Sequence, residues 1–268
     1  MKRALTSVWI EDSATNRGVG GSNPLGPAFI MTEFLIIILG ISLGFFIQTL
    51  LGFAAPLVAL PLLLLVLNIQ SAVAFMSIFS LLFCVSLFFT NWKFMDKKIL
   101  LELSAGILAG TAFGVYLLRY GNPVILKKVL GIFIILYVIY FYAVKGKEIK
   151  IPQYVGILFG FIGGIFSGMF SSGSPLFMTY TSNALKQKEI VRATIIGALS
   201  VSHIFRIPFL AYSNILTGDI LIKSLYVLPF FILSVLIGQK LFKRLKGETY
   251  INLVMIFLFL SGIGLIVL

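Results

Sequence analysis

Apolar runs of about 18 or more residues recur along most of the chain, and short polar stretches separate them. Each run is long enough to cross the hydrocarbon core of a bilayer as a helix. Only 11% of the 268 residues are charged, whereas a soluble domain carries about 25%. A soluble fold could not bury this much apolar surface. The sequence therefore predicts an all-α integral membrane protein with several membrane spans.

Two of the apolar segments are too short to span a bilayer. The segments lie at about 33–51, 57–67, 71–90, 99–117, 123–144, 152–170, 176–185, 190–212, 219–239 and 249–268. A helix of about 11 residues, such as 57–67 or 176–185, reaches roughly 16 Å, which is half of the hydrocarbon core. Each short segment follows an interruption, LGFAAPL at 51–57 or FSSGSPL at 170–176.

The two interruptions match at a constant offset, which indicates a repeat. Pro56 and Pro175 differ by 119 positions, and at the same offset Gly44 meets Gly163. Leu57 and Leu176, and Ala74 and Ala193, match in the same way. Each half then reads as a long segment, a break, a short segment and three spans. Interrupted segments at matching positions of two halves are typical of a transporter binding site.

Charge predicts how these halves lie in the membrane. If each break is a hairpin tip, the basic loops 91–98, 145–150, 186–192 and 240–246 all fall on one side, and 68–70 and 213–218 on the other carry no Lys or Arg. This asymmetry identifies the cytoplasmic side. Arg119, Lys127 and Lys128 are the exceptions.

The resulting fold has two inverted repeats, each a broken re-entrant helical hairpin followed by three transmembrane helices. It has about eight transmembrane segments by the usual counting, and both termini lie outside the cytoplasm. The repeats are 31–144 and 152–268, and 145–151 is a cytoplasmic linker. Residues 1–30 are polar and lack the apolar core of a signal peptide. We interpret them as a disordered or non-native leader before a start at Met31, or alternatively as an extramembrane tail.

The broken hairpins predict an internal anion site, because irregular backbone at membrane depth must be covered by protein or line a cavity. Pro56 and Pro175 suit the first turn of a helix. Both short helices would then direct their N-termini at the midplane, and two such N-termini favour an anion. The candidate binding residues at the tips are Gln48, Thr49, Gly52, Ala55, Pro56, Ser167, Ser171, Ser172, Gly173, Ser174 and Pro175. The competing interpretation is that they are helix caps and close-packing residues.

His203 and Arg206 share one helix face within the span 190–212. Ionisable groups in a span are costly and often functional. Arg206 could hold an anion, or it could extend to the headgroups as an anchor. His203 could relay protons or pack through a hydrogen bond. Cys84, at the place that matches His203, is predicted to be a packing residue.

Several function classes lack support in the sequence. The net charge of +12 is distributed over loops between spans, which does not indicate nucleic-acid binding. The chain has no phosphate-binding GxxxxGK[ST] loop. No His, Cys, Asp and Glu residues have the spacing of metal ligands, so we expect no metal or cofactor and no enzyme activity. No carboxylate is expected at mid-depth, which favours export driven by the membrane potential.

Residues 33–268 resemble the sulfite exporter TauE/SafE family of membrane permeases. The resemblance rests on the segment order, on GFFIQTLLGFAAPLVALPLLL and GGIFSGMFSSGSPLF, and on the following SAVAFMS and IVRATIIG. It implies a permease that moves sulfite, a sulfonate or a related sulfur-containing or organic anion across the cytoplasmic membrane. At Gln48, Thr49, Ala54 and Ala55 the chain departs from the family's glycine-rich pattern. An anion channel and a membrane-embedded enzyme or assembly factor are the alternatives.

Overall fold

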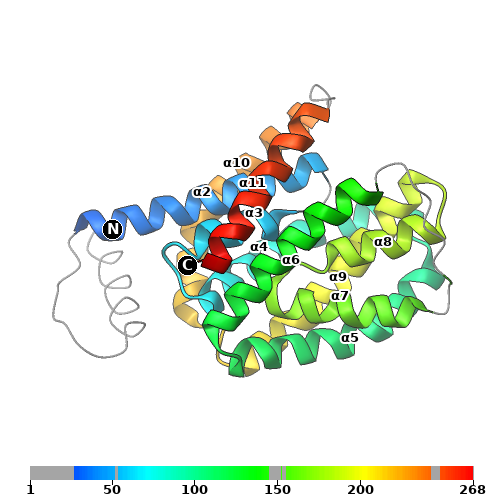
Figure 1. Ribbon diagram of the computed structural model, residues 1–268, viewed down its shortest axis with the longest axis horizontal. Coiled ribbons are helices and arrows are strands. Elements are labelled where there is room, and N and C mark those ends of the chain that lie inside the picture. The colour runs from blue at the N-terminus through cyan, green and yellow to red at the C-terminus, as the bar shows by residue number, and fades with distance from the viewer. Residues whose placement is uncertain (1–26, 52–53, 145–151, 153–154, 243–247, 268) are drawn as a thin grey trace.

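The protein is described by a computed structural model that covers residues 27–51, 54–144, 152, 155–242 and 248–267. Within these ranges all regular secondary structure is helical (Figure 1). Six helices are long and apolar enough to cross a membrane. They are α2 (Pro27–Leu51), α4 (Ile69–Asn91), α5 (Lys97–Tyr120), α6 (Pro123–Val144), α9 (Lys188–Tyr212) and α10 (Gly218–Phe242). The remaining helices are α3 (Ala55–Leu63), η1 (Trp92–Phe94), α7 (Gly156–Phe170), α8 (Ser174–Ala184) and α11 (Glu248–Val267). The prediction of an all-helical membrane protein is confirmed.

The two short helices follow the two predicted breaks. Helix α3 has 9 residues and α8 has 11, so they reach roughly 14 and 16 Å, well below the bilayer core of about 30 Å. Pro56 and Pro175 occupy the first turn of their helices, as predicted. Helix α2 begins at Pro27, four residues before the expected boundary at 31, and residues 1–26 lie outside the described part of the chain.

Each short helix folds back against the helix before it, and a matching glycine makes the contact close. A Cβ atom on Gly44 of α2 would lie 2.8 Å from Cβ of Ala59 and 2.9 Å from the carbonyl oxygen of Ala55, both in α3. A Cβ atom on Gly163 of α7 would enter the ring of Phe177 in α8. Because Gly44 and Gly163 match at the 119-residue offset, the two hairpins close in the same way.

Helices α5 and α7 pack together through two glycine rows, which we call the glycine seam: Gly106, Gly110 and Gly114 of α5, and Gly160, Gly164 and Gly168 of α7. A Cβ atom on Gly164 would lie 2.8 Å from the carbonyl oxygen of Ile107. One on Gly110 would strike the carbonyl oxygen of Phe161. Small residues at four-residue spacing allow helix backbones to approach this closely in membranes. The contacts advance together along both helices, so α5 and α7 run in parallel (Figure 1).

Polar contacts mark the two ends of this bundle. At the end where α5 begins, the amide of Asp96 donates to Oγ1 of Thr194 in α9 (3.0 Å) and Tyr180 of α8 donates to Oε2 of Glu102 (2.9 Å). At the end where α5 finishes, Nε2 of Gln70 in α4 donates to the carbonyl oxygen of Leu118 (3.2 Å). Helices α4 and α9 therefore have their N-termini at opposite ends of the molecule.

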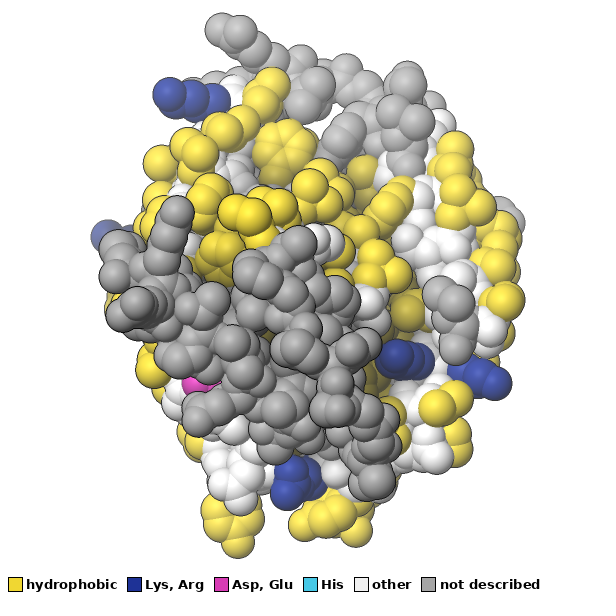
Figure 2. All heavy atoms as spheres, turned by 90° about the vertical axis from the view of Figure 1, so that its left-hand side faces the viewer, with side chains coloured by type: hydrophobic (Ala, Val, Ile, Leu, Met, Phe, Trp, Pro, Cys, Tyr) yellow, Lys and Arg dark blue, Asp and Glu magenta, His cyan; other side chains and the backbone are white. Residues whose placement is uncertain are grey.

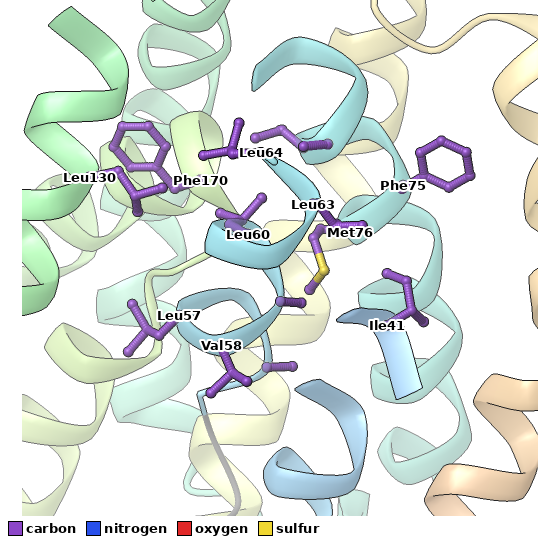
Figure 3. Packing of buried hydrophobic residues seen from close by; sticks show 14 of the residues in the cluster. Ile41, Leu57, Val58, Leu60, Leu63, Leu64, Phe75, Met76, Leu130 and Phe170 are labelled. Carbon is purple, nitrogen blue, oxygen red and sulfur yellow. The ribbon is translucent and has the colours of Figure 1, made fainter. Parts of the chain in front are cut away.

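Helix α3 forms the centre of the larger hydrophobic cluster. Figure 3 shows Leu57 and Leu60 of α3 near Leu130 of α6 and Phe170 at the end of α7, with Met76 of α4 on another side. Leu57, Leu60 and Leu130 are fully buried. This helix is therefore held by the surrounding helices over most of its surface.

The outside of the bundle is apolar. Large hydrophobic side chains are exposed on several helices, for example Leu39 of α2 (56%), Phe89 of α4 (78%) and Leu225 of α10 (66%). Figure 2 looks onto the end where α2 begins and shows hydrophobic side chains over much of the described surface, with Lys and Arg scattered among them. A surface of this kind is suited to lipid.

Candidate functional site

The tip of the first hairpin is closed by its own side chain. Oε1 of Gln48 in α2 accepts a hydrogen bond from the amide of Ala55, the first residue of α3 (3.1 Å). Oγ1 of Thr49 donates to the carbonyl oxygen of Phe45 one turn earlier (2.7 Å). Ala54, between the helices, has a φ of 93°, which is left-handed backbone. Ala55 and Pro56 are buried, and the candidate residue Gly52 lies outside the described residues. A donor that the predicted anion would have used is thus bound within the hairpin.

The tip of the second hairpin is built differently. Helix α7 ends at Phe170, and Ser171 takes the left-handed conformation with a φ of 60°. The amide of Ser171 donates to the carbonyl oxygen of Ser167 (2.8 Å) and that of Ser172 to the carbonyl oxygen of Phe166 (3.4 Å). The bond from Ser171 is that of an αL cap, in which a left-handed residue after the helix donates to the carbonyl oxygen four residues earlier. Helix α8 follows with Gly173 at its N-cap, which provides no side-chain cap, and Ser174 and Pro175 in its first turn.

Buried hydroxyl groups connect this second tip to three neighbouring helices. Oγ of Ser167 lies 2.6 Å from Oγ of Ser202 in α9, which lies 3.3 Å from Oγ1 of Thr111 in α5. Oγ of Ser171 donates to Oγ of Ser80 in α4 (3.4 Å). All five side chains are buried. The second tip therefore adjoins a polar wall, formed by these five hydroxyls, within an otherwise apolar bundle.

Arg206 is the most unusual group near this wall. Its side chain is fully buried, and none of its three guanidinium nitrogens has a hydrogen-bond partner among the described residues. The same is true of Nδ1 of His203 and Oγ of Ser172. These three residues contribute five of the seven buried side-chain nitrogen and oxygen atoms without a partner in the described part of the chain. All three were candidates from the sequence alone.

The burial of Arg206 argues against its predicted role as a headgroup anchor. A side chain that extended to the headgroups would be exposed at its tip, whereas Arg206 is 0% exposed. It lies four residues beyond Ser202 on α9, about 6 Å along the helix axis, and Ser202 contacts Ser167 one turn before the second tip. An isolated buried cation costs several kcal/mol. A small oxyanion could offset that cost by accepting charge-assisted hydrogen bonds from the guanidinium, and hydroxyls such as that of Ser172 could donate further ones.

His203 and Cys84 lie near this wall, but in different surroundings. His203 is three residues before Arg206 on the same helix and is 3% exposed. Cys84 of α4 is buried as a free thiol beside Ser200 of α9. Among the described residues, no group of three or more His, Cys, Asp or Glu side chains could hold a metal ion.

The sequence interpretation missed three of the hydroxyls and one cation. Ser80, Thr111 and Ser202 were not candidates, although Ser202 precedes Arg206 by one helical turn, which is a usable signal. Lys223 of α10 is 1% exposed, and its Nζ lies 3.3 Å from Oδ2 of Asp219. Its four-residue spacing from Asp219 is typical of an ion pair on one helix face.

Comparison with known proteins gives one family. The family model described as sulfite exporter TauE/SafE matches residues 36–265, which is nearly the whole chain. No curated protein and no solved structure matches the chain.

Proposed function

The chain belongs to the sulfite exporter TauE/SafE family, a family of membrane permeases, and on this basis we propose that it moves a small oxyanion across the cytoplasmic membrane. Sulfite, a sulfonate or a related sulfur-containing or organic anion is the proposed substrate. The binding site consists of Arg206, the second hairpin tip from Ser171 to Pro175, and the hydroxyls of Ser167 and Ser202. A multi-pass membrane protein of this family needs a bilayer and a small solute as its partners.

The buried, unpartnered guanidinium of Arg206 is the observation that carries this proposal. A bound oxyanion neutralises the cation and accepts its N–H groups. Each hydrogen bond to a charged group contributes about 1.5–3 kcal/mol. The N-terminus of α8 adds a partial positive charge of about half an elementary charge. Together these groups favour an anion over a neutral solute at the same place.

The proposed architecture is a pair of inverted repeats, 31–144 and 152–268, that surround this site. Corresponding helices make corresponding contacts: α5 packs on α7 as α10 packs on α2, and α2 on α3 as α7 on α8. Helices α4 and α9 contact each other, as do α6 and α11. The opening of the α7–α8 hairpin lies at the end where α5 begins, beside Glu102. The opening of the α2–α3 hairpin adjoins the start of α4, at the end of the molecule where α5 finishes. These contacts support hairpins that enter from opposite sides.

Export driven by the membrane potential is the proposed direction and energy source. The potential favours exit of an anion by about 2.3 kcal/mol per charge per 100 mV. Inverted vesicles, whose lumen corresponds to the cell exterior, should therefore take up the anion when the lumen is positive, without any proton gradient. Transport that requires a proton gradient at zero potential would contradict this mechanism.

The test of the proposed function is uptake of radiolabelled sulfite, thiosulfate and small sulfonates into inverted vesicles. The intact protein is compared with a variant that carries Ser171→Ala, Ser172→Ala and Ser174→Ala together, at equal protein level. Potential-dependent uptake that falls in the variant supports an anion permease with its site at the second tip. Uptake that survives would move the site elsewhere, and no uptake of any of these anions would refute the substrate class.

A further inference from the structure

A cavity of about 100 Å³ lies beside the first hairpin, away from the site at the second tip. Its polar lining comes from Thr49 at the end of α2, Ser86 of α4, Arg192 of α9 and Gln239 of α10, and Phe83 and Leu87 of α4 supply apolar walls. We call it the Arg192 cavity. A single water needs only about 10–15 Å³ of such volume, so the cavity has room for a small anion with part of its hydration shell.

The cavity lies at the end of the molecule that carries the basic loops. Arg192 is the fifth residue of α9 and lies two residues before Thr194, whose Oγ1 accepts a hydrogen bond from the amide of Asp96 at the start of α5. Gln239 is near the end of α10, next to the exposed Lys240. The charge pattern of the loops predicts that this is the cytoplasmic end. The cavity thus joins that end to Thr49, whose side chain is 8% exposed.

We propose that the Arg192 cavity is a cytoplasmic entry subsite, in which the guanidinium of Arg192 recruits the anion before it moves to Arg206. This inference rests on the proposed function. Arg192 is exposed, and a cation at the mouth of a partly apolar cavity concentrates counter-ions and raises their entry rate. The amide N–H groups of Gln239 can replace part of the hydration of an oxyanion, whereas the hydroxyl of Ser86 donates to the carbonyl oxygen of Phe83 (2.7 Å).

The repeat offset adds an independent argument for this place on the path. At 119 residues, Phe83 and Leu87 of the cavity wall correspond to Ser202 and Arg206 of the proposed site. The cavity and the buried site therefore occupy corresponding positions in the two halves. In carriers built from inverted repeats the substrate site lies where the two halves meet, so a cavity at the corresponding place in the first half borders the same path.

The first experiment measures thiol modification and does not depend on transport. The chain has a single cysteine, so Cys84→Ala gives a background in which Ser86→Cys is the only thiol. Inverted vesicles are treated with a membrane-impermeant anionic (sulfonated) or cationic (trimethylammonium) methanethiosulfonate. Each reagent's rate with the Ser86→Cys thiol is divided by its rate with a small thiol in solution. We expect this ratio to be higher for the anionic reagent than for the cationic one. Adding Arg192→Gln should lower that preference roughly five- to tenfold, and Arg192→Lys should retain most of it.

Val85→Cys is the matched control, because Val85 is the neighbouring exposed residue of α4 and does not line the cavity. It should react slowly with both reagents. Failure of Ser86→Cys to react, or reaction without a charge preference that depends on Arg192, would overturn the entry subsite even if anion uptake is intact. The expected labelling pattern in a protein that transports none of the anions would support the anion-recruiting cavity and refute the proposed substrate instead.

Uptake kinetics test whether the cavity serves transport. Arg192→Gln should raise KM for sulfite presented to the cytoplasmic face roughly five- to tenfold and leave kcat unchanged, and the difference should shrink at high salt. Arg119→Gln, an exposed arginine at the other end of α5, is the control and should leave KM unchanged. An unchanged KM in Arg192→Gln, or an equal rise in both variants, would overturn the entry role.

Discussion

The two hairpins have the same geometry, but their tips differ in which hydrogen-bonding groups could contact a bound anion. In the first, Gln48 accepts from the amide of Ala55, and the tip residues around it are alanines and proline. In the second, four serines surround the break, no side chain caps α8 at Gly173, and Oγ of Ser172 has no hydrogen-bond partner among the described residues. Arg206, which is fully buried, lies within about two helical turns of this tip through Ser202 and Ser167. This difference supports the proposal that the first hairpin is structural and that the second binds the anion.

The hairpins also differ in how their first helices are packed. Helix α7 contacts α5 through the glycine seam, backbone against backbone. Helix α2 contacts α10 at one glycine, Gly238, where an added Cβ would lie 2.9 Å from Cβ of Thr49. The Arg192 cavity opens beside that second contact. The serine-bearing hairpin is therefore fixed on a rigid surface, whereas the hairpin closed by Gln48 borders the cavity.

The largest expected effect is a loss of stability when a substitution disrupts the glycine seam. In Gly110→Ala the new methyl group would strike the carbonyl oxygen of Phe161, and overpacking against backbone should cost about 3 kcal/mol or more. We expect most of the protein to be lost as monodisperse material after detergent extraction. Gly238→Ala should cost less, because its new methyl group would lie 2.9 Å from Cβ of Thr49 and 3.3 Å from the carbonyl oxygen of Phe46, which is a milder overlap than the one with Phe161. Gly264→Ala, which meets nothing within 4 Å, is the control, and equal losses in all three variants would contradict the difference in packing.

The next largest effect concerns the charge at the second tip. Arg206→Gln removes the buried cation, and we expect potential-driven sulfite uptake to fall about 100-fold, or about 3 kcal/mol. Arg206→Lys should recover part of this loss, because it keeps the charge and loses the planar donor geometry. Uptake assays at matched protein level check both. An Arg206→Gln variant that transports normally would show that the guanidinium has only a packing role.

A smaller effect on uptake is expected when a single hydroxyl of the second tip, that of Ser172, is removed. Ser172→Ala should lower uptake about five- to tenfold, because one hydrogen bond contributes about 1 kcal/mol. The protein should not lose stability, since Oγ of Ser172 makes no hydrogen bond within the described residues. Ser182→Ala, at an exposed position near the end of α8, is the matched control. Loss of stability together with loss of uptake would indicate a structural serine.

The smallest effect on transport is expected at the first tip. Gln48→Leu removes the acceptor of the Ala55 amide, and loss of such a cap should cost about 1 kcal/mol of stability. Uptake should change less than about threefold, since the hairpin does not hold the anion. Thermal unfolding in detergent and sulfite uptake measure the two consequences separately. A Gln48→Leu variant that keeps its stability and loses transport would assign the anion to the first tip.

Much of the helical arrangement was predictable from the sequence because lipid imposes simple rules on length and polarity. The expected segments 123–144 and 190–212 agree with α6 and α9 to within two residues. Pro56 and Pro175 mark helix starts because proline lacks the amide hydrogen that would be unpaired there. The glycine seam was not predicted, although GILAGTAFG and GFIGGIFSG both carry glycines at four-residue spacing. Which of two such helices meet is decided by tertiary packing.

Part of the candidate site was predictable because polar residues and chain breaks stand out in a mainly apolar sequence. His203 and Arg206 were identified because ionisable groups are rare and costly in a span, and Ser172 because it lies at the second break, where irregular backbone predicts a cavity. The same logic treated the two tips as equivalent, because Ala55 and Ser174 match at the repeat offset. Sequence could not show that Gln48 turns back to cap Ala55, since that bond depends on how α2 and α3 pack. It also missed Thr111, whose hydroxyl meets Ser202 only after α5 and α9 come together.

Anomalous diffraction from crystals of the intact protein soaked in selenite, a heavier analogue of sulfite, tests the central claim most directly. The account predicts one ordered selenium peak within hydrogen-bonding reach of the Arg206 guanidinium and the Ser172 hydroxyl, and its absence in crystals of Arg206→Gln. A peak at the start of α3 beside Ala55, or one beside Arg206 that persists in Arg206→Gln, would contradict a binding site centred on the second hairpin.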